Sequence, residues 1–247
     1  MRKFNIILAL LMSLHFASFS QKADKAQECL KKIKEYTLQK NSLNLPSGKD
    51  YYYLKNKIQI SFWEKTEMPD IVENIEMIVG NGQLHYIADD IEMHQDKNDL
   101  LLIAHNAKSI IRTYPRSEST NSKEVKEKMQ FLDKAFFDMI DKLLIAEYNN
   151  QGDNIQLLEM QMNKKAQSVY SVNKVLCHYN TNKNNILKTE LFYVEDYQYK
   201  KMTIWYYDEN YDYKANLKNK VIYYALDKRG KLLSQYQNYE FTNDKDF

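Results

Sequence analysis

The chain has few of the residues that interrupt regular secondary structure or cross-link a small fold. Among its 247 residues are five glycines, three prolines and two cysteines. These counts exclude a collagen-like chain, a Gly/Pro-rich disordered chain, a disulfide-dense mini-domain and a Cys₄ zinc module. The glycines and prolines all fall between the elements predicted below: Pro46, Gly48, Pro69, Gly80, Gly82, Pro115, Gly152 and Gly230. This scarcity is typical of a long meander of regular strands with two helices.

Sequence motifs of known catalytic chemistry are also missing. The chain has no Gly-x-Ser-x-Gly elbow, no His-Glu-x-x-His helix and no glycine-rich phosphate loop. Asp89-Asp90 at a strand end is typical of a turn rather than of acid–base catalysis. His85 and His94 fall on consecutive predicted strands and, with Asp89 or Glu92, a metal pair is conceivable. Because each histidine alternates with apolar neighbours, we expect both on the surface, away from the core. We predict no enzyme activity, no cofactor and no metal site.

Residues 1–20 have the pattern of a secretory signal peptide. Two basic residues precede an unbroken apolar run from Ile6 to Met12, and Ser18 and Ser20 are small residues at the −3 and −1 positions of a cleavage site before Gln21. The alternative is a retained membrane anchor, which needs about 20 apolar residues, and this run is shorter and interrupted by polar side chains. We therefore predict a mature chain that begins at Gln21 and is exported to the periplasm.

Removal of residues 1–20 also removes the net positive charge. The full chain has a formal net charge of +2, whereas the chain after residue 20 has 33 basic and 33 acidic side chains. A neutral chain of mixed sign produces no field that attracts nucleic acid or an anionic membrane, so nucleic acid is not expected as a partner. Bacterial lipid attachment requires a cysteine directly after the apolar run, and Cys29 lies beyond it in a polar helical pattern. We expect a soluble protein without a lipid anchor or a stable transmembrane segment.

Cys29 and Cys177 are the two cysteines of the chain. In an oxidising compartment they either form one disulfide or remain two separate thiols. A disulfide requires their Cα atoms to lie within roughly 7 Å, which the spacing in the sequence does not decide.

The first half of the mature chain has the pattern of one helix followed by short strands. Residues 23–39 repeat apolar side chains every three to four positions, which predicts a helix. Over residues 51–114 apolar and polar residues alternate, as in Ile58-Gln-Ile-Ser-Phe62, and turn sequences such as Gly80-Asn-Gly82 separate the runs. Such short turns join antiparallel neighbours, because parallel strands need a long crossover.

The second half begins with a predicted helix over residues 122–147, whose apolar side chains fall on one face at spacings of three and four. About six strands are expected between residues 156 and 241, and the tyrosine-rich residues 208–219 are interpreted as a long loop. The fold class is α+β: a strongly curved antiparallel sheet of about ten or eleven strands, an incomplete β-barrel, with helices covering its concave face. Residues 21–247 are expected to form a single domain.

Tyrosine is over-represented, with 20 residues in the chain, of which 11 lie beyond residue 190. One interpretation is an exposed aromatic surface that stacks on sugars or contacts a partner protein. The other is the preference of tyrosine for strands, combined with a compositional bias of the genome.

The order of the predicted elements resembles that of a known family. The stretches Ile58–Phe62, Gly82–Tyr86 and Met93–Ile103, followed by Ile110, form a series of strand, Gly-led strand, Asp turn and strand. With Lys201–Tyr206 before the loop, this series is similar to the meander and closing strands of the LolA-like periplasmic lipoprotein carriers and their LolB-like outer-membrane receptor relatives. The resemblance implies an incomplete barrel whose helices cover an apolar cavity for acyl chains. Carriers of that family have an arginine in the first strands that holds the lid closed, and this chain lacks it there.

The resemblance implies a monomeric soluble carrier that binds lipid or the acyl chains of lipoproteins, as in outer-membrane lipoprotein sorting in a Gram-negative bacterium. The candidate cavity residues are Ile58, Ile60, Phe62, Ile75, Met77, Leu84, Tyr86, Met93, Met129, Leu132 and Phe136. These residues either line a cavity or form a filled core, as most apolar stripes do. With a filled core, the alternative function is a non-enzymatic cell-envelope module that binds a protein partner.

Overall fold

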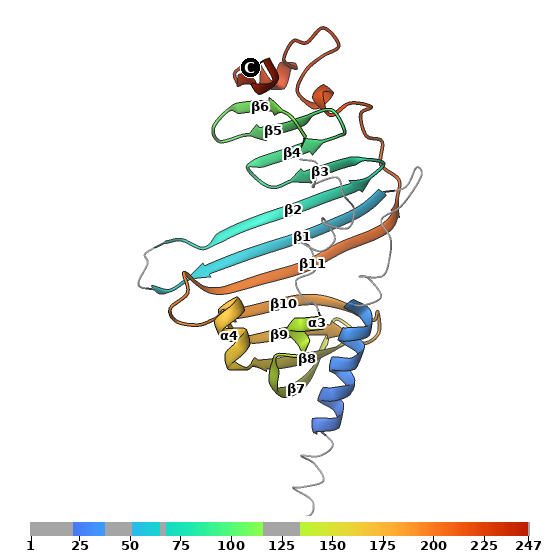
Figure 1. Cartoon of the computed structure of the whole chain (residues 1–247). Helices are drawn as coiled ribbons and strands as arrows, with labels where there is room; N and C mark the ends of the chain where they lie inside the picture. The colour runs from blue at the N-terminus through green and yellow to red at the C-terminus, as the bar shows by residue number, and fades with distance from the viewer. Residues whose placement is uncertain (1–21, 38–50, 65–67, 116–133, 247) are drawn as a thin grey trace, which may run out of the picture. The chain divides into compact units, whose positions relative to one another are not determined.

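The structure, a computed structural model, describes residues 22–37, 51–64, 68–115 and 134–246 (Figure 1). Its strands form one open sheet in the order β12-β6-β5-β4-β3-β2-β1-β11-β10-β9-β8-β7. Neighbours along the chain pair antiparallel, as β2 does with β3 and β7 with β8, whereas β12 pairs with β6 in parallel. The predicted α+β class and the unclosed, mostly antiparallel sheet are confirmed.

The described elements begin with a helix at residues 22–37. The strands are β1 (Tyr51–Phe62), β2 (Ile71–Gly80), β3 (Gln83–Ile87), β4 (Ile91–Gln95), β5 (Leu100–Ala104), β6 (Ser109–Thr113), β7 (Ile140–Asn150), β8 (Asp153–Met162), β9 (Val172–Asn180), β10 (Asn185–Tyr193), β11 (Tyr199–Tyr213) and β12 (Glu240–Asn243). The short helices are α3 (Lys134–Phe137), α4 (Lys164–Tyr170) and the 3₁₀ helices η2 (Val221–Tyr224), η3 (Ser234–Tyr236) and η4 (Asp244–Asp246).

The contacts between residues divide the chain into two compact units. Among the described residues, unit 1 consists of 22–37, 60–64, 68–70 and 134–204. Unit 2 consists of 51–59, 71–115 and 205–246. The chain passes from one unit to the other within β1 and again within β11, so each of these strands contributes residues to both units.

Strands β2–β6 of unit 2 form the antiparallel meander that the sequence predicts. Asn81 and Gly82, between β2 and β3, have positive φ angles of 51° and 69°. This is the backbone geometry of a two-residue hairpin turn, and it accounts for the Asn-Gly sequence at this point. In the resulting register Met77 lies opposite Tyr86, and Tyr86 lies opposite Met93.

The two faces of this meander carry different side chains, because successive residues of a strand point to opposite sides. The front face carries one buried cluster: Tyr52, Met77, Val79 and Leu84. The back face carries a second cluster, in which strand residues pack against residues of the chain that follows β11: Leu101, Ile103, Ile110, Ala225 and Tyr236. Residues 214–243, which we call the C-terminal segment, therefore cover the back face.

The prediction of strands in residues 220–241 is partly wrong. Val221–Tyr224 and Ser234–Tyr236 are 3₁₀ helices, while Glu240–Asn243 does pair as a strand with β6. Apolar and tyrosine side chains are common in strands because they suit a half-buried surface, and here packing on the back face of the meander provides that burial without pairing. The loop expected over residues 208–219 is also shorter, because β11 continues to Tyr213.

In unit 1 the helix of residues 22–37 lies against strands β7–β9 (Figure 1). Its buried side chains Ala26, Cys29 and Ile33 are spaced by three and four residues, as one helix face requires. Lys25 forms an ion pair with Glu147 of β7, with 3.3 Å between Nζ and Oε2. The described part of the predicted helix 23–39 is thus confirmed. None of the helices in the described ranges is long and apolar enough to cross a membrane.

Cys29 of this helix and Cys177 of β9 are both buried free thiols. Burial raises the pKa of the Cys29 thiol to about 12 and also raises the pKa of Cys177. Because the thiolate is the reactive form of cysteine, both residues are held in their unreactive form. Of the two alternatives, the structure has two separate thiols rather than a disulfide.

The predicted helix 122–147 is wrong over its second half. Residues 122–133 lie outside the described residues, Lys134–Phe137 is helical, and Ile140–Asn150 is the strand β7. An apolar spacing of four places residues on one side of a helix and, because four is an even number, also on one side of a regular strand. The apolar pattern of these residues therefore does not distinguish a helix from a strand. The hairpin to β8 decides in favour of a strand, with Gln151 and Gly152 at positive φ angles of 52° and 90° in its turn.

Candidate functional site

The structure brings six of the predicted cavity residues together in unit 2. They lie on the front face of the meander and on the adjoining part of β1: Ile58, Ile75, Met77, Leu84, Tyr86 and Met93. Met77 and Leu84 are buried, whereas Ile75, Tyr86 and Met93 are half-buried. Leu102 of β5 lies opposite Met93 and continues the same row. The front face is therefore mainly apolar across four consecutive strands, and its burial decreases away from the Met77–Leu84 end. By the same alternation it also carries two polar side chains, Glu73 on β2 and the buried Gln95 on β4.

The remaining predicted residues are not placed with this group. Ile60 and Phe62 belong to unit 1, where the Phe62 ring lies 5.5 Å from that of Tyr199. Phe136 is also in unit 1 and is buried against Phe137 and Tyr170. Met129 and Leu132 lie outside the described residues. The role of the whole set in binding stays a prediction.

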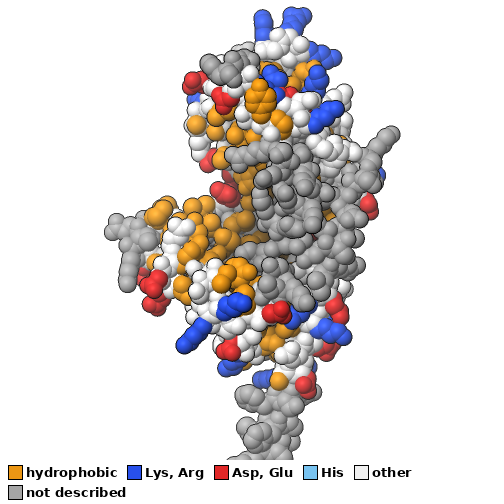
Figure 2. Space-filling view, in the orientation of Figure 1, with side chains coloured by type: hydrophobic (Ala, Val, Ile, Leu, Met, Phe, Trp, Pro, Cys, Tyr) orange, Lys and Arg blue, Asp and Glu red, His pale blue; other side chains and the backbone are white. Residues whose placement is uncertain are grey.

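Two exposed apolar side chains extend the front face away from its buried Met77–Leu84 end. Ile71 at the start of β2 is 40% exposed, and Ile91 at the start of β4 is 49% exposed. By strand alternation Ile71 lies on the side of Ile75 and Met77, and Ile91 lies on the side of Met93. Figure 2 shows hydrophobic side chains gathered where Figure 1 draws the left-hand parts of β1 and β2, while acidic and basic side chains are interspersed elsewhere.

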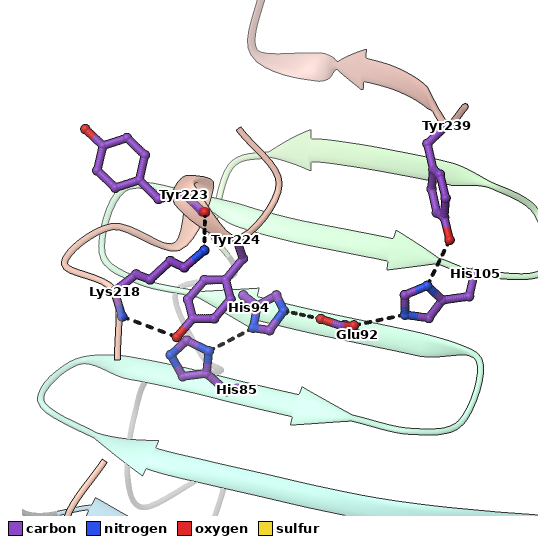
Figure 3. A network of polar contacts seen from close by, with 8 residues as sticks. All are labelled: His85, Glu92, His94, His105, Lys218, Tyr223, Tyr224 and Tyr239. Atoms are coloured by element: carbon purple, nitrogen blue, oxygen red, sulfur yellow. Dashed lines mark hydrogen bonds and ion pairs between the residues drawn. The ribbon is translucent and has the colours of Figure 1, made fainter. Parts of the chain in front are cut away.

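The back face of the same strands carries a chain of polar contacts (Figure 3). His85 of β3 and His94 of β4 lie directly opposite each other, with 2.8 Å between their Nδ1 atoms. His94 Nε2 lies 2.8 Å from Glu92 Oε2, and the other carboxylate oxygen of Glu92 lies 2.9 Å from His105 Nε2. His105 Nδ1 in turn lies 3.0 Å from the hydroxyl of Tyr239. We call these five residues the histidine network.

One placement of protons satisfies every contact in the histidine network. The Glu92 carboxylate accepts, so the Nε2 atoms of both His94 and His105 carry hydrogens. Neutral His94 then has a bare Nδ1, which accepts from the Nδ1 hydrogen of His85. Hydrogen bonds from His94 and His105 lower the pKa of Glu92. Burial, together with the nearby His94, lowers the pKa of His85 to about 3. In this arrangement Glu92 is ionised and His85 is neutral.

The C-terminal segment covers the histidine network. The Tyr224 ring stacks on the His94 ring, with 4.3 Å between centroids and 10° between planes. Lys218 donates from its backbone nitrogen to the Tyr224 hydroxyl at 3.3 Å, and its ammonium lies 4.9 Å from the centroid of the Tyr224 ring (Figure 3). Asp96 Oδ2 accepts from the backbone nitrogen of Val221 at 3.1 Å. The segment thus covers the His85–His94 end of the network, whereas the side chains of His105 and Glu92 stay 30% and 21% exposed.

This position corrects the expectation that His85 and His94 are surface residues. Both are 1% exposed. The alternation correctly places them on the face opposite Leu84 and Met93, but the C-terminal segment buries that face as well. Within the described ranges no group of three or more His, Cys, Asp or Glu residues is arranged to hold a metal ion. His85 and His94 lie a few residues before and after the turn Ala88–Asp90. This spacing in the sequence predicts that the two histidines pair across β3 and β4.

A separate polar cluster lies on unit 1. His178 Nε2 lies 3.0 Å from Glu190 Oε1 and His178 Nδ1 lies 2.9 Å from the Tyr148 hydroxyl. Glu190 also accepts from Lys188 at 2.7 Å and from Lys201 at 3.3 Å. Burial opposes ionisation of Glu190, but the hydrogen bonds from Lys188 and His178 outweigh it and lower its pKa to about 2.

No family model and no curated protein sequence matches this chain. Among solved structures, the chain is similar to LprF from Mycobacterium bovis, with 8% identity, 81% of this chain and 97% of that chain covered, and a TM-score of 0.41. It is also similar to a LolA superfamily protein from Nitrosomonas europaea, with 10% identity, 76% and 95% covered, and a TM-score of 0.28. A putative outer membrane lipoprotein-sorting protein domain from Vibrio parahaemolyticus shares 12% identity, with 78% and 95% covered and a TM-score of 0.28.

The predicted resemblance to LolA-like proteins is confirmed as a distant similarity of fold. The three identities are 12% or lower and the three TM-scores lie below 0.5. The functions of these proteins are therefore not transferred to this chain.

Proposed function

We propose that this protein is an exported, non-enzymatic carrier that binds the acyl chains of a lipid or a lipoprotein on the front face of strands β2–β5. The observation that supports the proposal is the row of half-buried apolar side chains Ile75, Tyr86 and Met93, with the exposed Ile71 and Ile91 on the same side. The exposed Glu73 is the charged residue of β2 on this side. The back face of the same strands is packed against the C-terminal segment. In this proposal the packed back face stabilises the fold, and the front face binds the ligand.

An acyl chain suits such a face because its recognition needs contact area rather than placed polar groups. Burial of apolar surface contributes about 25 cal/mol per Å², or about 0.8 kcal/mol per methylene. About ten buried methylenes contribute roughly 8 kcal/mol before the entropy of association is subtracted. A micromolar or weaker affinity follows, which suits a carrier that must release its ligand.

The proposal is tested by native mass spectrometry of protein purified from the periplasm of cells that express the full chain. We expect a polypeptide that begins at Gln21 and carries lipid or acylated protein. A clean mass of the unliganded chain, together with failure to bind a fluorescent fatty acid, contradicts the carrier function. Recovery of the chain with residues 1–20 intact contradicts export by a cleaved signal.

Two pairs of exposed residues offer a matched test of which face binds. Ile71→Lys with Ile91→Lys places two charges on the front face of β2 and β4, whereas Val72→Lys with Ile87→Lys places two charges on the back face of β2 and β3. The four positions are similarly exposed, at 40%, 49%, 44% and 37%. We predict at least a ten-fold loss of fatty-acid affinity for the front-face variant and little change for the other. Equal losses in both variants contradict binding on the front face.

A second candidate is the non-enzymatic cell-envelope module that binds a protein partner, with the same fold and a filled core. The buried cluster of Tyr52, Met77, Val79 and Leu84 supports it, because this end of the front face is already packed. The module predicts that cross-linking in cells captures one defined envelope protein, and that purified protein carries no lipid.

A further inference from the structure

The histidine network and the proposed ligand face share the same two strands. His85 lies between Leu84 and Tyr86 along β3, and Met93 lies between Glu92 and His94 along β4. Leu84, Tyr86 and Met93 point to the front face, whereas His85, Glu92 and His94 point to the back face. A change in the separation of His85 and His94 therefore moves front-face side chains directly.

We propose that the His85–His94 pair is an acid-sensitive latch: protonation of the pair loosens residues 218–226 from the back face and weakens ligand binding on the front face. The coupling to the ligand rests on the proposed function, whereas the latch itself concerns the protein alone.

The acid sensitivity follows from the number of hydrogens and acceptors on the imidazole nitrogens of His85 and His94. With His85 and His94 both neutral, the one imidazole nitrogen without a hydrogen bond is His85 Nε2, a buried atom with no partner in the described structure. It can remain a bare acceptor at neutral pH. A proton added there creates a buried imidazolium with no acceptor for its N–H, which is strongly unfavourable.

The other positions for an added proton are no better. A proton on His94 Nδ1 requires the hydrogen of His85 to move to its own Nε2, which leaves the same buried donor without an acceptor. Protonation of both Nδ1 atoms opposes two hydrogens across 2.8 Å. Protonation of Glu92 removes the charge that holds His94 and His105. Each acid form is relieved when the cover of Tyr224 lifts and water enters.

Other titratable and charged groups surround the pair. Asp96, in the turn after β4, favours the charged form of His85, and Glu92 and Tyr224 contact His94. Further out, His105, Tyr236 and Tyr239 act on Glu92 or on one another, and Lys218 lies over the Tyr224 ring. Asp96 already accepts from the backbone nitrogens of Asn98, Asp99 and Val221. It therefore reduces the penalty for a proton on His85 without supplying an acceptor for Nε2.

The pH range follows from the two forms of His85. In water a histidine takes up a proton below a pKa of about 6.5, whereas in the closed structure burial lowers its pKa to about 3. Between these values the open form binds a proton that the closed form does not. The closed form therefore loses stability as the pH falls below about 6.5, and the opening equilibrium constant rises by up to about ten-fold per pH unit.

The test is hydrogen–deuterium exchange of the whole protein between pH 7.5 and 5.0, corrected for the pH dependence of chemical exchange. We expect peptides from residues 218–226 and from β3 and β4 to exchange faster at pH 5.0, by at least ten-fold in the opening constant. Peptides from β8 and β9 serve as the internal reference. Equal protection of residues 218–226 at both pH values overturns the latch.

His85→Gln separates the latch from general acid sensitivity. The glutamine amide donates to His94 Nδ1 and, after rotation, accepts from it, so both protonation states of His94 are satisfied. We expect this variant to lose the pH step. His178→Gln is the matched control, because His178 is also buried beside a glutamate, in unit 1. A pH step that persists in His85→Gln, or that disappears in His178→Gln, overturns the assignment.

Fatty-acid binding at pH 7.5 and 5.0 then tests the coupling. If the latch is coupled to the ligand, the affinity of the wild-type protein for fatty acid falls between pH 7.5 and pH 5.0. The fall in the His85→Gln variant is several-fold smaller. Ligand binding that is independent of pH, in a protein that shows the exchange step, overturns the coupling. If fatty acid binds neither at pH 7.5 nor at pH 5.0, while residues 218–226 still exchange faster at pH 5.0, the proposed function is overturned and the latch is supported.

Discussion

At the residue scale, Glu190 of β10 shows how the sheet keeps a carboxylate ionised in a half-buried position. Three cationic or hydrogen-bonding side chains contact it: His178, Lys188 and Lys201. Together they outweigh the effect of burial, so the pKa of Glu190 falls from 4.5 to about 2. A carboxylate with a lowered pKa stabilises the folded state above its unfolded pKa, and this stabilisation is lost as the pH falls through the folded value.

Glu190→Gln therefore lowers stability at neutral pH. We predict a loss of about 1 to 2 kcal/mol at pH 7, since solvent partly screens these ion pairs, and a difference from wild type that shrinks between pH 4.5 and pH 2. Urea denaturation at several pH values measures it. Glu195→Gln, at an exposed position in the next turn, is the control and is expected to change little. A loss that is constant from pH 7 to pH 2 contradicts the ionic origin.

The histidines show what single-residue reasoning could predict and what it could not. Alternation along β3 and β4 correctly assigns His85 and His94 to the face opposite Leu84 and Met93. It does not reveal whether that face is covered, because the cover comes from Tyr224, over 100 residues further along the chain. The pairing of the two histidines was accessible from the sequence, whereas their burial depended on a long-range contact.

At the element scale, β7 shows the limit of periodicity. Its apolar residues Leu143, Leu144 and Ile145 are adjacent, and such a short run suits a helix and a strand equally well. The deciding feature lies outside the run, in the turn Gln151-Gly152 that returns the chain as β8. By contrast, the meander β2–β6 was predictable, because strict alternation and Asn-Gly or Asp-rich turns occur together there.

The turn between β7 and β8 should accordingly be sensitive to the loss of its glycine. Gly152 has a φ of +90°, where a Cβ is strained although no neighbouring atom lies in the way. We predict that Gly152→Ala destabilises the protein by about 1 to 2 kcal/mol, measured by thermal or urea denaturation. Gln151→Gly, at a φ of +52°, should be close to neutral, because relief of strain offsets the added freedom of the unfolded chain. Equal destabilisation by both changes contradicts this origin.

At the scale of the whole molecule, the fold and the candidate site were predictable to different degrees. The antiparallel meander follows from alternation, and alternation also places Ile75, Tyr86 and Met93 on one side. Their partial exposure depends on which face the C-terminal segment covers. That cover was not predictable, because the pattern of residues 220–241 indicated strands of the sheet. Unit 2 is therefore a sheet with one packed face and one that is only partly packed, and this asymmetry supports a binding role for the second.

The asymmetry is measurable with two truncations on neighbouring strands. Ile103 on the back face is fully buried, whereas Met93 on the front face is half-buried. We predict that Ile103→Ala lowers the free energy of unfolding by about 2 to 5 kcal/mol, as expected for a cavity in a packed core, and Met93→Ala by less than about 1.5 kcal/mol. Urea denaturation of the unliganded protein gives both values, and fatty-acid binding is expected to weaken in Met93→Ala. If both truncations destabilise the protein equally and neither alters binding, the front face is a filled core, and the envelope module becomes the better account of the function.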